Sequence, residues 1–269
     1  MLGKVMKHEI KSTSRLFLPL MAGFIIVTIL CRFAFESSSS VFLQNNRVLD
    51  LIRVIFMTLY FIYIVALFVM TSVFIVIHFY KTMVSDQGYL TNTLPVKTST
   101  IINGKLLTAV MWEIVSGLLL ILSIFTFFIG NISMSDLQEF FRDCQTLLEE
   151  AAQYVNLPLL ITEFTIGAIV SLLSGPLMLY AAIALGHLFR KHRVLWAVIS
   201  YLGIYVIMQI LSSVFFGICG YSSPSYYSGD YAARTMENYM MFSVIFSIAC
   251  TAGFYAITDY IFSRKLNLE

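Results

Sequence analysis

The chain has few charged residues for its length. Only 12% of its 269 residues are Asp, Glu, Lys or Arg, whereas 59% are hydrophobic. An ordinary soluble domain carries about 25% charged residues, so charged side chains would be too scarce here to cover a water-facing surface. This scarcity excludes one soluble globular domain and predicts a polytopic membrane protein.

The sequence also lacks the residue patterns that bind nucleotides and metals. A P-loop needs a glycine-rich turn ending in Gly-Lys-Ser/Thr before a helix, and neither Gly3-Lys4 nor Gly104-Lys105 has that context. The four cysteines show no metal-ligand spacing. His187 and His192 are five residues apart, which does not align them on a helix and favours interfacial polar groups over ligands. We therefore expect no catalytic residue, cofactor or metal site in this chain, and no nucleic-acid partner.

Six apolar runs are long enough to cross a bilayer, for which a helix needs about 20 residues. The runs are uniformly apolar and lack the alternation of a transmembrane β-barrel. We therefore expect an all-α membrane protein, with residues 1–269 as one transmembrane domain. The expected spans are Leu16–Phe35, Val54–Ile77, Leu106–Ile129, Leu157–Leu185, Val194–Ile218 and Tyr239–Phe262.

Positive charge gathers on one side of the expected spans, and cytoplasmic flanks retain Lys and Arg. That side holds twelve of the seventeen basic residues: Lys4, Lys7, Lys11, Arg15, Lys81, Lys97, Lys105, Arg190, Lys191, Arg193, Arg264 and Lys265. The other side carries an acidic connection, residues 130–156, with Asp136, Glu139, Asp143, Glu149 and Glu150. We therefore expect both termini in the cytoplasm and the acidic connection on the opposite side of the membrane.

Residues 1–15 are amphipathic. Their cations recur at positions 4, 7, 11 and 15, while Leu2, Val5, Met6 and Ile10 form a separate apolar stripe. This pattern favours an interfacial elbow helix lying at the headgroup level, with Pro19 redirecting the chain into the first span. Ordinary flanking charge is the alternative. The first apolar run is too long for a signal-peptide core, so we expect no cleaved targeting segment.

The connection between the second and third spans, residues 79–104, is longer than a turn requires. Antiparallel helices are usually joined by about 2 to 8 residues. Asp86-Gln87-Gly88 allows a helix break, and Pro95 removes a backbone donor near the end of the segment. We therefore expect one or two short cytoplasmic helices parallel to the membrane that bind a partner, with a simple turn as the alternative.

Short motifs in the first 115 residues suggest which partner this is. They are Lys7-His8-Glu9, Arg15-Leu16-Phe17-Leu18-Pro19-Leu20, Phe79-Tyr80-Lys81, Asp86, Gly88-Tyr89-Leu90, Thr93-Leu94-Pro95-Val96, Lys105-Leu106-Leu107 and Trp112. Together they resemble the permease subunits of bacterial ABC transporters, the ABC-2 type exporters common in Firmicutes. Beyond residue 115 the resemblance rests on the number of spans.

This resemblance implies an elbow helix, a coupling helix between spans two and three, and two permeases, identical or homologous, with two ATPase subunits that bind ATP and Mg. The expected ATPase-coupling residues are Lys81, Asp86, Gly88, Tyr89, Leu90, Leu94 and Pro95. The chain would then form the pathway for a hydrophobic or amphipathic substrate, such as an antimicrobial peptide or a drug, and would not be an enzyme by itself. A membrane scaffold or sensor that binds a cytoplasmic partner through the same segment is the alternative.

Four residues inside the expected spans are candidates for the translocation pathway: Glu113, Glu163, Gly175 and Pro176. A carboxylate is costly in hydrocarbon, so Glu113 is either paired with a neighbour or exposed to a cavity. Glu163 lies near the outer end of its expected span, which favours an interfacial position. Gly175-Pro176 is expected to kink the fourth span, either for packing or as a hinge. A disulfide between Cys144 and Cys219 on an oxidising outer side also stays open.

Overall fold

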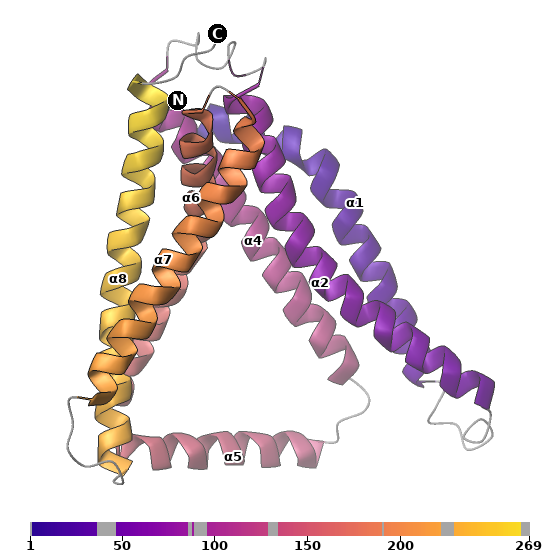
Figure 1. The fold of residues 1–269 in the computed structure, drawn as a ribbon. Coiled ribbons are helices and arrows are strands. Elements are labelled where there is room, and N and C mark those ends of the chain that lie inside the picture. The colour runs from indigo at the N-terminus through magenta and orange to yellow at the C-terminus, as the bar shows by residue number, and fades with distance from the viewer. Residues whose placement is uncertain are drawn as a thin grey trace. The chain divides into compact units, whose positions relative to one another are not determined.

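The computed structural model describes residues 2–36, 47–85, 88, 96–128, 134–189, 191–221 and 229–264. Within these ranges the chain forms seven long α-helices and no strand. They are α1 (Leu2–Glu36), α2 (Arg47–Met83), α4 (Thr98–Phe128), α5 (Met134–Ala152), α6 (Leu157–His187), α7 (Arg193–Tyr221) and α8 (Gly229–Arg264). The all-α prediction is confirmed for the described residues (Figure 1).

Six of these helices, all except α5, are long and apolar enough to cross a membrane, as the sequence predicts. Five of them contain their expected span in full; α4 begins at Thr98, before the expected Leu106, and ends at Phe128, and Ile129 lies outside the described residues. Large apolar side chains such as Phe33, Phe61 and Leu122 are exposed on their outer faces. Helices that are apolar both inside and outside are typical of a lipid environment, so the chain is a multi-pass membrane protein.

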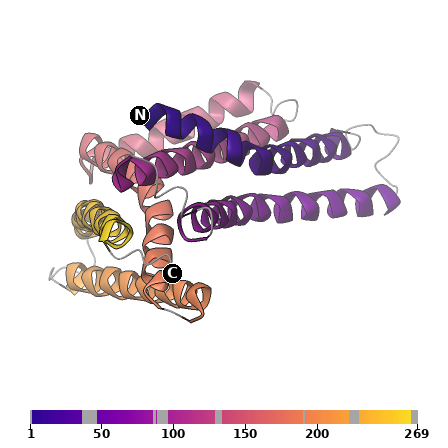
Figure 2. The same ribbon diagram turned by 90° about the horizontal axis from the view of Figure 1, so that it is seen from above.

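Residues 2–15 and the expected first span belong to one helix, and whether residues 1–15 lie at the headgroup level as an elbow stays a prediction. α1 is one continuous helix that contains Pro19, and Figure 2 shows that it is bent. Proline removes one helical hydrogen bond and crowds the preceding turn, which accounts for a bend without a break. The cations Lys4, Lys7, Lys11 and Arg15 all lie on the exposed side of α1.

The structure divides into two compact units, and the first consists of Met1–Phe79 and Asn103–Met134. Its core follows one stripe of α1, whose buried residues recur every three or four positions: Glu9, Thr13, Phe17, Met21, Phe24, Thr28 and Cys31. Polar contacts also cross this unit. The hydroxyl groups of Tyr60 on α2 and Ser123 on α4 are 2.7 Å apart, and those of Thr71 and Ser116 are 3.3 Å apart.

The second unit consists of Tyr80–Ile102 and Ser135–Glu269, and its helices pack through small residues and aromatic rings. Gly186 on α6 lies against the backbone of Ala197 on α7, where an added Cβ would come within 2.5 Å of the Ala197 nitrogen. Phe215 on α7 stacks on Phe242 on α8. At the beginning of α6, the Asn156 backbone N–H donates to Glu237 Oε1 of α8 at 2.8 Å.

The acidic connection contains a helix that the sequence analysis did not predict. α5 covers 19 residues, and none of them is buried. Figure 1 shows α5 as a separate rod that does not continue α6. Cys144 on α5 carries a free thiol.

Candidate functional site

A buried charged cluster joins the N-terminal part of α1 to α2 and α4. The Lys105 ammonium donates to Glu9 Oε1 at 2.6 Å, and His78 Nε2 contacts the other carboxylate oxygen, Glu9 Oε2. Glu9 is 8% exposed and Lys105 is 3% exposed. One carboxylate therefore links three helices through two basic side chains.

The polar contacts continue one helical turn along α1. The Thr13 hydroxyl donates to the Glu9 carbonyl oxygen at 2.8 Å and accepts from the Trp112 indole N–H of α4 at 2.9 Å. The Trp112 ring stacks on Phe17, with ring centroids 4.6 Å apart. We call Glu9, Thr13, His78, Lys105 and Trp112 the Glu9 cluster.

Charge and close packing both favour this arrangement. A buried ammonium or carboxylate is costly to remove from water, and a close hydrogen-bonded partner offsets that cost. The side chain of Val5 lies against Gly104, where an added Cβ would come within 2.8 Å of Val5 Cγ1. The small residue at 104 therefore lets α1 approach α4 one position before Lys105.

The cluster lies at the helix ends that lead into the connection between α2 and α4. His78 is in the last two turns of α2, and Lys105 is in the first two turns of α4. His78 and Lys105 both contact Glu9 of α1, so the two helix ends that flank the connection are held by the same residue. The described residues include no group of three His, Cys, Asp or Glu side chains placed to hold a metal. The Glu9 cluster is a charged contact among three helices.

Few of the predicted coupling residues lie in the described ranges. Lys81 is exposed in the last turn of α2, and Gly88 is buried. The remaining five lie outside the described residues: Asp86, Tyr89, Leu90, Leu94 and Pro95. Their part in coupling stays a prediction.

Gly88 is held in a tight backbone turn. Its N–H donates to the Ser85 carbonyl oxygen at 2.6 Å. A Cβ at position 88 would lie 2.5 Å from the Met83 carbonyl oxygen and 2.7 Å from its carbon. Both atoms belong to the backbone, so any other residue at 88 requires the chain to shift. The sequence analysis assigned Gly88 a helix break, and the structure adds this close approach.

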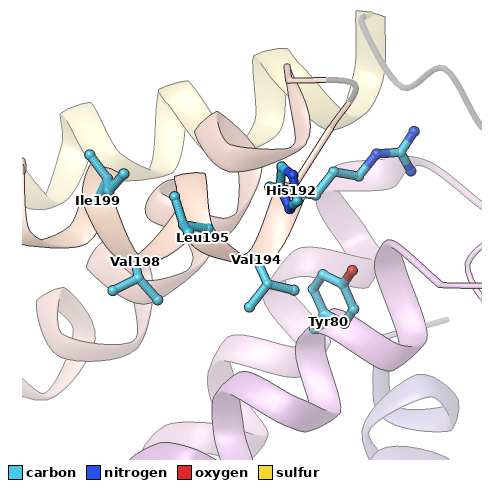
Figure 3. Close-up of a pocket in the computed structure, with 7 residues that line it drawn as sticks. Tyr80, His192, Val194, Leu195, Val198 and Ile199 are labelled. Atoms are coloured by element: carbon cyan, nitrogen blue, oxygen red, sulfur yellow. The ribbon is translucent and has the colours of Figure 1, made fainter.

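A cavity of about 790 Å³ is lined by Tyr80, near the end of α2, and by residues at the beginning of α7 (Figure 3). Tyr80 contributes one side, and His192 and Arg193 contribute the polar part of the other. The apolar part consists of Val194, Leu195, Val198 and Ile199. His192 has a positive φ of 55°, and its carbonyl oxygen accepts from the Trp196 N–H at 3.1 Å, within the first turn of α7.

Within the first unit, Glu9 brings together the beginning of α1, the end of α2 and the beginning of α4. Which side of the membrane is cytoplasmic remains a prediction from charge.

The predicted pathway residues are divided between the two units. Glu113 is half-buried on α4 in the first unit, and Glu163 is half-buried on α6 in the second. Glu163 Oε2 has no hydrogen-bond partner among the described residues. Gly175 is exposed and Pro176 is buried within α6, which continues through both. Whether these residues share one pathway, and whether α6 yields at Pro176, stay predictions.

The depth of Glu113 differs from the value expected from the sequence. A span beginning at Leu106 would place Glu113 roughly 10 Å along its helix. Because α4 begins at Thr98, Glu113 lies fifteen residues into it, or about 22 Å from its first residue. Residues 98–104, which the sequence analysis assigned to the connection, therefore belong to this helix.

The chain matches no protein-family model, no curated protein and no solved structure.

We predict that replacing Glu9 alone destabilises the protein more than replacing Glu9 and Lys105 together. Glu9→Met removes the carboxylate that Lys105 contacts, a change that costs about 3–5 kcal/mol in a buried ion pair. Glu9→Met with Lys105→Met removes both charges and restores much of that loss. The measurement is denaturant or thermal unfolding of the purified chain in detergent.

Lys11→Met, on the exposed side of the same helix, is the matched control and should change stability by at most about 0.5 kcal/mol. Equal, small effects for Glu9→Met and Lys11→Met would show that the Glu9 carboxylate is not part of a buried pair.

Proposed function

We propose that this chain is the permease subunit of an ATP-driven ABC exporter in a bacterial plasma membrane. Two such subunits, identical or homologous, would form the pathway for a hydrophobic or amphipathic substrate. Two separate ATPase subunits would bind ATP and Mg. The elbow and coupling helices, the cytoplasmic termini and the direction of transport belong to this proposal.

The observation that carries the proposal is the Glu9 cluster at the base of the long connection. A force applied to residues 84–97 is transmitted best when the helices on both sides are fixed to a common element. Glu9 contacts His78 near the end of α2 and Lys105 near the beginning of α4, so α1 is that element.

Three further features support the proposal. The motifs of residues 79–96 resemble those of ABC-2 permeases, and no P-loop is present in the sequence. Six helices are long and apolar enough to cross a membrane, as a permease requires. Gly88 is buried in a turn that tolerates no side chain without a backbone shift, which is expected of a segment whose shape has to fit another protein.

In the proposed mechanism, ATP binding draws the two ATPase subunits together and moves residues 84–97. The Glu9 cluster transmits this motion to α1, α2 and α4. The pathway then changes from inward-facing to outward-facing, with the substrate binding the two states differently.

The experiment that tests this function is purification of the tagged chain from its native membrane with mass spectrometry of the chains that accompany it. We expect an ABC ATPase in stoichiometric amount, with ATP hydrolysis that rises when an amphipathic peptide or drug is added. An associated ATPase whose turnover responds to no substrate would favour the scaffold or sensor. Absence of any ATPase from an intact complex would contradict the proposal.

We predict that Gly88→Ala weakens binding of the ATPase, because its Cβ would overlap the Met83 carbonyl group. The matched control is Gly117→Ala on α4, where an added Cβ has no atom within 4 Å. The control should keep the complex and gain about 0.5–1 kcal/mol of helix stability. Yield of co-purified ATPase and substrate-stimulated hydrolysis are measured for both variants at equal membrane expression. Wild-type values for Gly88→Ala would show that residues 84–97 are not the docking surface.

A further inference from the structure

The unexplained element of the structure is α5, a helix whose apolar side chains are exposed among the described residues. Phe140, Phe141 and Leu147 are 62%, 63% and 65% exposed. At 100° per residue, the apolar residues fall within one arc of about 140°. They are Met134, Leu137, Phe140, Phe141, Cys144, Leu147 and Leu148.

The opposite face of α5 is polar and acidic. It carries five acidic residues and one basic residue: Asp136, Glu139, Arg142, Asp143, Glu149 and Glu150. Gln145 also lies there and donates from Nε2 to Glu149 Oε1 at 2.9 Å. The separation of the two faces is complete along the helix. This is the pattern of a helix that lies in a boundary between water and an apolar medium.

The neighbouring spans hold α5 close to the membrane surface. Five residues separate α5 from the end of α4, and four separate it from the beginning of α6. Even fully extended, these connections reach about 18 Å and 14 Å. The 19 residues of α5 measure about 28 Å. An upright helix would therefore carry one end beyond the reach of its connection, so α5 has to run closer to parallel with the surface.

We infer that the apolar face of α5 is buried in the lipid of the membrane face opposite residues 84–97. Its position on that face follows because α4 crosses the membrane once between the two segments. Phe140, Phe141, Leu147 and Leu148 enter the boundary between headgroups and acyl chains, and the acidic face contacts water. Removing these apolar side chains from water is favourable. Attraction to anionic headgroups does not contribute, because the polar face is itself acidic.

The inference is tested by fluorescence quenching on the full-length chain in zwitterionic lipid nanodiscs. Changing Cys31, Cys219 and Cys250 to serine leaves Cys144 on the apolar face as the one site for a fluorescent label. The matched control moves that cysteine to the polar face, as Glu139→Cys with Cys144→Ser. One quencher is a doxyl group on the lipid acyl chain, and the other is iodide in the buffer.

We expect the lipid quencher to reduce the fluorescence at Cys144 several-fold more than at position 139, with iodide giving the reverse order. A label at Leu148→Cys should behave like the label at Cys144. Agreement between the two sites would show that the result reports the position of the helix and not a property of one labelled site. Equal quenching of both faces by iodide would place α5 off the membrane. Protection of Cys144 from both quenchers would show that protein covers this face. Either result overturns the inference.

Discussion

The interaction on which the first unit depends is the buried contact between Glu9 and Lys105. An ammonium that is 3% exposed is tolerated beside apolar helices because the Glu9 carboxylate lies 2.6 Å away. That requirement fixes α1 against α4, and His78 adds α2 to the same carboxylate. Thr13, Trp112 and Phe17 extend the joint into the aromatic core. The charged contacts of Glu9 and the aromatic contacts of Phe17 therefore lie next to each other where α1, α2 and α4 pack together.

The position of this joint is what connects the fold to the proposed function. In a lipid environment, apolar surface drives helices together less than it does in water, so close packing and interhelical polar contacts carry more of the association. The Glu9 cluster supplies such contacts beside the 84–97 connection. We infer that this joint is where the first unit receives force from a partner.

The spans were predictable from sequence because a run of about 20 apolar residues has few alternatives to a membrane helix. The Glu9 cluster was not, because Glu9, His78 and Lys105 are far apart in the chain and each has a local explanation as flanking charge. The spacing of Glu9, Thr13 and Phe17 could have predicted it, because these buried residues recur every four positions and form one stripe that continues into the first span. The α5 helix was not predicted because residues 130–156 were interpreted only by their acidic charge. Their apolar positions nevertheless follow a helical period.

The most direct measurement of the central claim is a disulfide between Val5→Cys and Gly104→Cys in native membranes. A Cβ at position 104 would lie 3.5 Å from Val5 Cβ, within the range that a disulfide spans. With the native cysteines replaced, mild oxidation should join these positions, whereas Lys4→Cys with Gly104→Cys should not react, because Lys4 lies on the exposed side of α1. Rapid cross-linking of the Val5 pair alone is the predicted result. Failure of that pair to cross-link would show that residues 1–15 lie apart from α4 and would contradict the Glu9 joint.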